Sequence, residues 1–312
     1  MRNLAALLAL LLATTASAAS NEGQAGAQFL KLGSSARAGG MGDAFTAVSD
    51  DAYAVHYNPA GLTRLERSQI GGGHTALFQR VTYQSFALAV PFGKEEGWRR
   101  HALGLGVLYL GVGDIERRTG DSTNPVGTFG AADSAYSLTY AHGFSESLSV
   151  GVTGKHINQS IDTYRGSAFG ADLGLLYRLS DGPHAPALGL AVKNAGTRIG
   201  YTAAERDPLP TTASVGASFR PYSGKLLVSL EAGKASDADP FGALGLEGRK
   251  AFGEGAAAAL RFGYNSSRRE LGTMSGVSAG AGLSFPKADF DLAWVPFGPL
   301  GDSFRFSLLV KF

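Results

Sequence analysis

Apolar and polar residues alternate along most of the chain from residue 65 onward. In residues 303–312, for example, every even position is apolar, whereas the odd positions include Ser303, Arg305, Ser307 and Lys311. Successive side chains of a β-strand point to opposite faces of the sheet. A segment with this period is therefore predicted to be a strand with one apolar and one polar face.

The same alternation predicts about fourteen strands. They are expected at residues 67–78, 82–92, 101–112, 133–144, 148–160, 167–179, 187–196, 209–220, 225–234, 241–252, 256–265, 273–285, 287–296 and 302–312. An even number of strands of this length lets the first and last strands pair antiparallel, which closes a barrel without exposed edges. We therefore predict an all-β fold, a transmembrane antiparallel β-barrel over residues 65–312. Alternation alone leaves a soluble β-sandwich as the alternative.

The second face of these strands is small or charged. Its glycines would leave room for a segment inside the barrel. The charged positions of this face are predicted to be Glu231, Lys287, Asp289, Asp291 and Arg305. Charges that faced lipid would be costly, so their shared parity supports the barrel assignment. We interpret them as internal ion pairs of a solvated lumen, with a substrate path as the alternative.

The connections between the predicted strands differ in length. Residues 143–147 and 285–287 are short and suit periplasmic turns, whereas residues 113–132, 197–208 and 297–301 resemble external loops. All three of these loops follow odd-numbered strands. With a periplasmic N-terminus they would all face the outside.

The first 18 residues have the pattern of a secretory signal peptide. Arg2 provides the positive charge, residues 4–12 are apolar, and Ala16-Ser17-Ala18 is an A-x-A cleavage site. The mature chain is expected to begin at Ala19. Export through the inner membrane is compatible with a destination in the outer membrane.

Residues 29–62, FLKLGSSARAGGMGDAFTAVSDDAYAVHYNPAGL, are almost the only part of the mature chain that is not predicted as strand. Ser49 is a candidate N-cap, and Asp50 and Asp51 would then lie in the first turn of a helix. That helix is expected to end near Tyr57, because Asn58 precedes a proline.

This segment resembles the N-terminal signature of the PorV/PorQ family of outer-membrane proteins, and it shares its Asp-Asp-Ala and Asn-Pro-Ala pieces with the FadL-type transporters of long-chain fatty acids. The resemblance implies a 14-stranded barrel with residues 19–64 folded into the lumen as a hatch. It also implies that the hatch controls passage of a ligand, which makes Asp50, Asp51, Asn58, Pro59 and Ala60 candidate ligand or gate residues. From the residues alone, Asp50 and Asp51 would cap their helix or pair with Arg37 or an arginine of the wall.

Composition excludes several other classes of protein. The chain has no cysteine, and its formal net charge of +2 gives no basic field for nucleic acid. The six histidines lack metal-ligand spacing, no catalytic constellation is present, and no cofactor or metal is expected. The terminal Phe312, after an alternating strand, is typical of outer-membrane proteins and is expected to be the signal for the barrel-assembly machinery.

Three functions are compatible with these features. The first is passage of small hydrophobic molecules across the outer membrane, with the hatch as gate. The second is a non-enzymatic role as a barrel partner in protein secretion or surface attachment, and the third is a structural, porin-like role. The expected partners are outer-membrane lipid, the barrel-assembly machinery and either a hydrophobic ligand or secretion proteins.

Overall fold

The computed structural model describes residues 23–79, 81–93, 100–121, 123–180, 185–202, 204–272 and 274–312. The predicted signal peptide and its cleavage site lie outside these residues. Within the described ranges, no helix has the length and apolar character needed to span a membrane.

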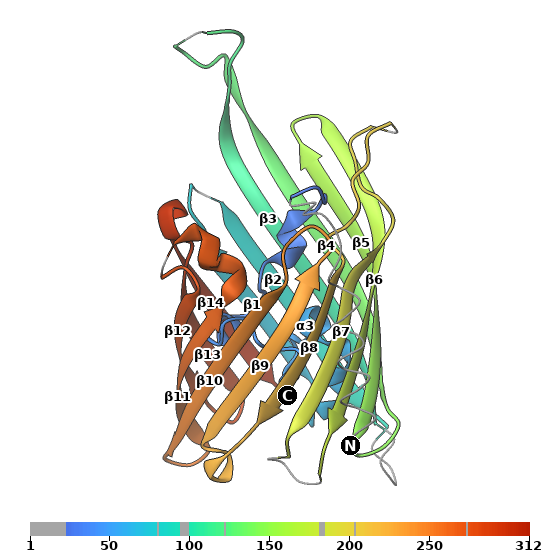
Figure 1. The fold of residues 1–312 in the computed structure, drawn as a ribbon, viewed down its shortest axis with the longest axis vertical. Helices are drawn as coiled ribbons and strands as arrows, with labels where there is room; N and C mark the ends of the chain where they lie inside the picture. Colours follow the sequence, from blue (N-terminus) through green and yellow to red (C-terminus); the bar gives the residue numbers. More distant parts are fainter. Residues whose placement is uncertain are drawn as a thin grey trace.

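Fourteen antiparallel strands close into a barrel, as predicted (Figure 1). The strands are β1 (Gln69–Ala76), β2 (Thr82–Phe92), β3 (Arg100–Arg117), β4 (Gly127–Gly143), β5 (Leu148–Ile161), β6 (Tyr164–Arg178), β7 (Ala187–Gly196), β8 (Thr212–Phe219), β9 (Leu226–Ala235), β10 (Phe241–Phe252), β11 (Ala256–Asn265), β12 (Val277–Ser284), β13 (Ala288–Pro296) and β14 (Asp302–Lys311). Each strand pairs with its neighbours in sequence, and β1 pairs with β14, so the sheet has no open edge.

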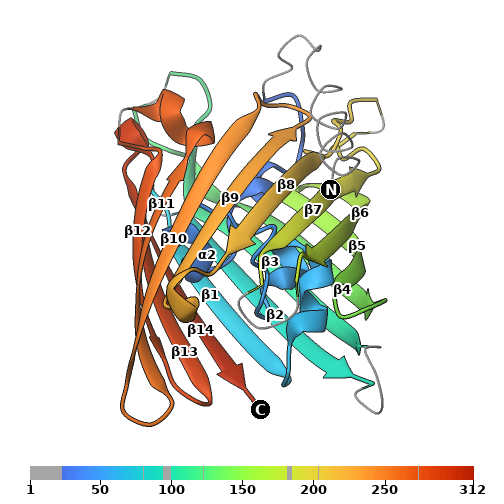
Figure 2. The same cartoon turned by 60° about the horizontal axis from the view of Figure 1, so that its bottom comes forward.

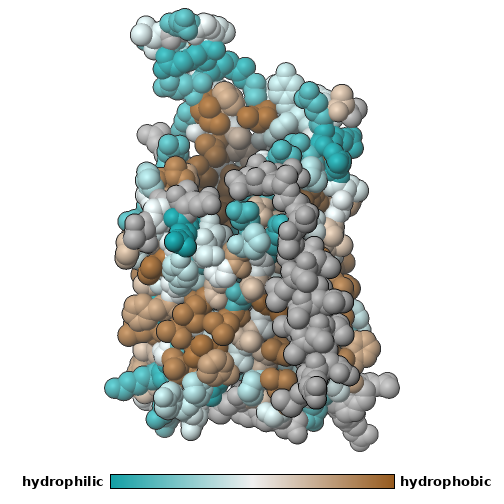
Figure 3. Space-filling model, viewed as in Figure 1, coloured by the Kyte–Doolittle hydropathy of each residue, from teal (hydrophilic) through white to brown (hydrophobic). Residues whose placement is uncertain are grey.

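The two faces of each strand meet different surroundings. Leu138 and Leu260 point outward and are 61% and 64% exposed, whereas their neighbours Thr139 and Arg261 point into the lumen and are at most 1% exposed. A soluble sandwich would bury the apolar set, so these exposures distinguish the two folds that alternation had left open. Apolar surface lies on the barrel below the hydrophilic tip of the β3–β4 hairpin (Figure 3).

The connections lie at two ends of the barrel. Those after odd-numbered strands form the loop end, and those after even-numbered strands form the turn end. The prediction of a loop at residues 113–132 is wrong. Most of these residues are strand, and they extend β3 and β4 beyond the rest of the loop end (Figure 1). Along this extension the hydrophobic alternation stops, while the backbone pairing continues past a register shift between Val112 and Ile115.

Two predicted strand starts are also too early. The twelfth strand begins at Val277 rather than 273, because residues after β11 form the 3-10 helix η4 (Ser266–Leu271). The eighth begins at Thr212 rather than 209. The other loop-end connections include residues 197–211, η4 and the 3-10 helix η5 (Gly298–Leu300), whereas the 3-10 helix η3 (Tyr222–Gly224) lies at the turn end.

Residues 23–65 lie inside the barrel, and we call them the hatch (Figure 2). The hatch contains the 3-10 helix η1 (Gln28–Lys31), the helices α2 (Ala36–Gly40) and α3 (Ala54–Tyr57), and the 3-10 helix η2 (Pro59–Arg64). It begins at the loop end, where Gly23 N donates to Asp237 O, and leaves at the turn end to enter β1. Phe45, Val48 and Leu62 are fully buried, so the hatch forms the apolar core of the lumen.

The helix predicted from Ser49 is much shorter than expected. It begins at Ala54, and Ser49 does not cap it, because the Ser49 hydroxyl donates to Phe45 O instead. Asp50 and Asp51 precede the helix and are engaged in tertiary ion pairs, which override the local helix signal. The predicted end at Tyr57 is confirmed.

Candidate functional site

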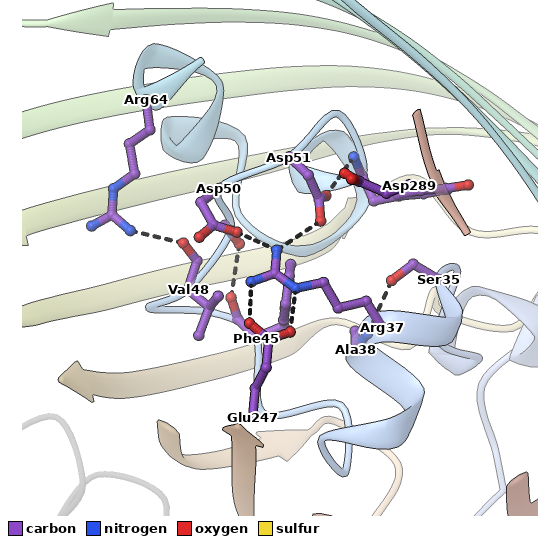
Figure 4. Close-up of polar contacts among 12 residues, drawn as sticks. Ser35, Arg37, Ala38, Phe45, Val48, Asp50, Asp51, Arg64, Glu247 and Asp289 are labelled. Carbon is purple, nitrogen blue, oxygen red and sulfur yellow. Dashed lines mark hydrogen bonds and ion pairs between the residues drawn. The ribbon is translucent and has the colours of Figure 1, made fainter. Parts of the chain in front are cut away.

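A buried cluster of charges joins the hatch to the barrel wall. Ser35 caps α2 by accepting from Ala38 N, and α2 then directs Arg37 toward β10. The Arg37 guanidinium holds Glu247 in a two-pronged contact, with Nε to Oε2 at 2.8 Å and Nη2 to Oε1 at 3.1 Å (Figure 4). Its Nη1 also contacts Asp50 at 2.5 Å and Asp51 at 3.3 Å. One hatch arginine therefore binds three carboxylates.

The same network extends along the wall. Arg261 Nε donates to Glu247 at 2.7 Å and Arg261 Nη1 donates to Asp291 at 2.7 Å, while Arg220 Nη2 reaches Asp50 at 2.6 Å. Glu247 and Arg261 are each 1% exposed. We call this set the Arg37 cluster; it comprises Arg37, Asp50, Asp51, Arg220, Glu247, Arg261 and Asp291. Because each carboxylate in it has a cationic partner, the burial of these charges is compensated.

The two adjacent hatch carboxylates of the cluster have different electrostatic surroundings. Burial opposes ionisation of Asp50, but the charges of Arg37 and Arg220 outweigh it and hold the pKa of Asp50 well below its usual range. Burial raises the pKa of Asp51 to about 7, and the charges of Asp50 and Asp291 add to this effect against the attraction of Arg37. Asp50 is thus a fixed anion, whereas Asp51 titrates near neutral pH.

A second ion pair lies toward the loop end. Arg305 Nη1 of β14 donates to Asp43 Oδ1 at 2.8 Å, and the Tyr57 hydroxyl donates to the same oxygen at 3.2 Å. Arg268 of η4 lies 3.8 Å from the other Asp43 oxygen. The loop-end helix η4, the hatch and the wall therefore meet at one carboxylate.

Asn58 joins the hatch to the opposite side of the wall. Its Oδ1 accepts from Ala60 N, and its Nδ2 donates to Thr46 O at 2.8 Å and to Leu175 O of β6 at 3.1 Å. Pro59 and Ala60 lie over wall glycines. A Cβ at Gly174 would stand 2.0 Å from Asn58 Oδ1, and one at Gly151 would stand 2.5 Å from Ala60 N. Only glycine permits this approach of the hatch backbone to β5 and β6.

The remaining predicted residues are not all brought together. Glu231 accepts from Thr46 N at 2.9 Å inside the lumen, and Asp289 pairs with Lys311 at 2.6 Å near the turn end. Lys287 is an exposed residue of the β12–β13 turn and not part of the lumenal cluster, because the strand whose parity placed it there begins only at Ala288. Phe312 is 67% exposed at the turn end, where its backbone N donates to Ser68 O.

Several lumenal residues were not singled out from the sequence. Glu247 and Arg261 lie in glycine- and alanine-rich stretches and show no motif. A buried pair between Lys155 of β5 and Asp172 of β6, at 2.7 Å, was missed as well, although both residues have lumenal parity. Asn194 accepts from Lys155 Nζ and donates its backbone N to Asp172. These four residues, Glu247, Arg261, Lys155 and Asp172, could have been found only by recording every charged residue at the strand positions that face the lumen.

Two cavities lie on either side of the hatch. The one toward the loop end has a volume of about 300 Å³ and is lined by residues including Asp43, Tyr57, Lys193, Arg268 and Arg305. The one at the turn end has a volume of about 630 Å³ and is lined by residues including Asp50, Arg64, Arg178 and Arg220. Within the described ranges, no group of histidine and carboxylate side chains has the arrangement of a metal site.

Comparison with known proteins places this architecture among outer-membrane barrels. The sequence model of the family "Type IX secretion system protein PorV" matches residues 16–234. The fold is similar to that of the CymD monoaromatic hydrocarbon channel (TM-score 0.63, 14% identity, covering 90% of this chain and 98% of that one). It is also similar to the toluene transporter TbuX of Ralstonia pickettii (TM-score 0.59, 14% identity, 90% and 98% covered) and to a Pseudomonas aeruginosa FadL homologue (TM-score 0.58, 11% identity, 89% and 98% covered). No curated protein sequence matches the chain.

Proposed function

The chain belongs to the family of the type IX secretion system protein PorV, and from this premise we propose that it is a plugged outer-membrane barrel that serves as a partner in protein secretion. In this role the lumen is closed, and exported proteins or secretion components bind at the loop end. Residues 19–64 would form the plug and residues 65–312 the membrane-embedded wall.

The Arg37 cluster is the observation that carries this proposal. Withdrawing the hatch would separate Arg37 from Glu247, which is 1% exposed, and Asp50 from Arg220. Breaking one buried pair in this way typically costs about 3–5 kcal/mol. These ion pairs between the hatch and the wall favour a permanent plug over a gate that opens frequently. The surface left for function is then the loop end, with the β3–β4 hairpin, residues 197–211 and η4.

A second candidate is passage of small hydrophobic molecules, with the hatch as gate. The fold is shared with hydrocarbon channels, and the loop-end cavity includes apolar side chains such as Leu30, Leu108 and Phe297. In this case Asp50, Asp51 and the Asn58-Pro59-Ala60 turn would have to release the wall for the hatch to move.

The proposal also assigns sidedness. The loop end would face the exterior and the turn end the periplasm, after cleavage of the signal peptide following Ala18. Phe312 would be the residue by which the barrel-assembly machinery recognises the nascent chain. The apolar outer face would contact outer-membrane lipid.

An engineered disulfide between the hatch and the wall would distinguish the two proposed functions. A Cβ at Gly216 of β8 would stand 3.2 Å from Ala47 Cβ of the hatch, close to the spacing found in disulfides. The chain has no natural cysteine, so an Ala47→Cys, Gly216→Cys variant forms this bond alone. The two single variants and the reduced double variant are the controls.

We expect the oxidised variant to support surface display of secreted proteins as well as the wild type does in a deletion strain. Loss of secretion on oxidation, with recovery on reduction, would contradict the plug. Loss of uptake of a monoaromatic hydrocarbon on oxidation, with secretion unaffected by deletion of the gene, would favour the transport candidate instead.

A further inference from the structure

Five arginines line the turn-end cavity; Arg100 and Arg249 are exposed, whereas Arg64, Arg178 and Arg220 are partly buried and come from three separate elements. Arg64 ends η2 of the hatch, Arg178 ends β6, and Arg220 directly follows β8. All three line the same volume of about 630 Å³. None of the three belongs to the hatch signature that the sequence singled out.

The positive charge of this group is only partly compensated. Arg220 pairs with Asp50, which Arg37 shares. Arg64 Nη1 donates to the backbone oxygens of Ala47 at 3.1 Å and Val48 at 2.7 Å (Figure 4). Arg178 Nε donates to Glu146 O at 2.8 Å. Among the residues that the structure describes, no carboxylate forms an ion pair with Arg64 or Arg178.

The Arg64 guanidinium lies close enough to Arg220 and Arg178 to be repelled by both charges. Burial lowers the pKa of Arg64 to about 10, Asp50 opposes this shift, and the charges of Arg220 and Arg178 reinforce it. An anion placed among them would relieve this repulsion. The other carboxylates that line the cavity compete little, because Glu247 is already paired twice, and Glu66 and Glu146 are exposed to water at the rim.

The remaining polar groups of the cavity suit an oxyanion. Thr63, Ser145 and Ser149 line it, and the Thr63 hydroxyl donates to Ser149 Oγ at 2.7 Å. Guanidinium groups bind phosphate through paired N–H donors, and hydroxyls supply further donors. Approach from three elements matches the several oxygens of a tetrahedral anion better than the two oxygens of a planar carboxylate.

We propose that the turn-end cavity is a binding site for a phosphate-type oxyanion, held by Arg64, Arg178 and Arg220. This site borders the Arg37 cluster and shares Asp50, Arg220 and Glu247 with it, whereas Arg64 and Arg178 lie outside that cluster. It does not depend on whether the barrel serves secretion or transport. The anion could be a free phosphate or the headgroup of an anionic phospholipid.

Titration calorimetry of the full-length protein in detergent with inorganic phosphate tests the site. We expect Arg178→Gln to weaken phosphate binding at least tenfold. Arg165→Gln is the matched control, because Arg165 is an exposed residue at the other end of the same strand. Arg64→Gln should have a similar effect, but Arg64 also contacts the hatch backbone. The decisive variant is therefore Arg178→Gln, because the Arg178 side chain donates to Glu146 O of the β4–β5 turn and not to the hatch in the part of the chain that the structure describes. Equal binding by Arg178→Gln and wild type, or absence of phosphate binding by the wild type, would overturn the proposal.

A second experiment, in nanodiscs, distinguishes free phosphate from a phospholipid headgroup as the bound anion. Phosphate affinity is compared between discs of phosphatidylcholine and discs that contain phosphatidylglycerol. A fall in affinity with phosphatidylglycerol, seen in the wild type and in Arg165→Gln, identifies a lipid headgroup as the occupant. An unchanged affinity identifies free phosphate. Either result supports the oxyanion site.

Discussion

The hatch is attached to two sides of the barrel by different interactions. Toward β10 and β14 it is held by ion pairs, with Arg37 bound to Glu247 and Asp43 bound to Arg305. Toward β5 and β6 it is held by backbone contact over Gly151 and Gly174 and by the amide of Asn58. We call these the charged side and the glycine side.

The two sides tolerate change differently. On the charged side, an ion pair fails when one partner is removed, because the other charge remains buried. On the glycine side, contact fails when an atom is added, because no space exists for it. The same segment is therefore sensitive to loss of atoms on one side and to gain of atoms on the other.

The largest effect is expected from removing the centre of the charged side. Arg37→Met leaves Glu247, Asp50 and Asp51 with fewer cations, and we expect the free energy of unfolding to fall by about 3–5 kcal/mol. Urea unfolding in lipid vesicles, followed by intrinsic fluorescence, measures this change. Arg165→Met, at an exposed position, is the control. An unchanged urea midpoint for Arg37→Met would show that the charged side does not hold the hatch.

Adding one atom to the glycine side should have the next largest effect. Gly174→Ala places a Cβ 2.0 Å from Asn58 Oδ1 and 2.7 Å from Pro59 Cδ, and we expect a loss of about 1–3 kcal/mol. Protease cleavage of the hatch should become faster in parallel. Gly154→Ala adds the same atom on the outward face of β5, where nothing lies within 4 Å, and should be neutral. Equal behaviour of the two variants would refute close packing at β6.

Removing the Asn58 amide should weaken the glycine side without adding volume. Asn58→Ala leaves the carbonyl oxygens of Thr46 and Leu175 and the N–H of Ala60 without this partner, for an expected loss of about 1–2 kcal/mol. Combined with Gly174→Ala, the effects should be less than additive, because both act on one contact. Urea midpoints of the two single variants and the double variant measure this coupling. Strictly additive effects would show that Asn58 and Gly174 act independently.

The last effect expected is a pH dependence of the charged side. Because burial raises the pKa of Asp51 to about 7, the folded protein retains a proton there that the unfolded chain releases above about pH 4. The free energy of unfolding should therefore decrease modestly between pH 5 and pH 7 and then level off. Asp51→Asn should remove this part of the pH dependence, as measured by urea midpoints at each pH. A variant with the same profile as the wild type would exclude Asp51 as its source.

The wall could be predicted from sequence because lipid and lumen impose opposite demands on neighbouring positions. Residues 302–312 were predicted as strand, and β14 spans Asp302–Lys311. The alternation is missing in the extension of β3 and β4, so these parts of the two strands were not predicted. Lys287 was wrongly assigned to the lumen because the alternation was extended from β13 into the preceding turn, where side chains do not alternate between two faces.

The site was predictable only where its contacts are local. The turn at Asn58 and Pro59 has a sequence signature because it bonds to its own backbone. Arg37 and Glu247 are 210 residues apart, and no sequence pattern near either residue indicates that the two form a pair. Long-range ion pairs depend on the register of the whole barrel, which alternation constrains but does not fix.

The β3–β4 hairpin has a consequence for what a large molecule meets first. A tilted membrane strand needs about 9–11 residues, whereas β3 has 18 and β4 has 17. At about 3.3 Å per residue, the surplus of about 7–9 residues lengthens the β3 side of the hairpin by roughly 23–30 Å along the strand. Its tip is hydrophilic and rises above the other loops (Figures 1 and 3). A macromolecule that approaches from this side would touch the hairpin before it reached the mouth of the lumen.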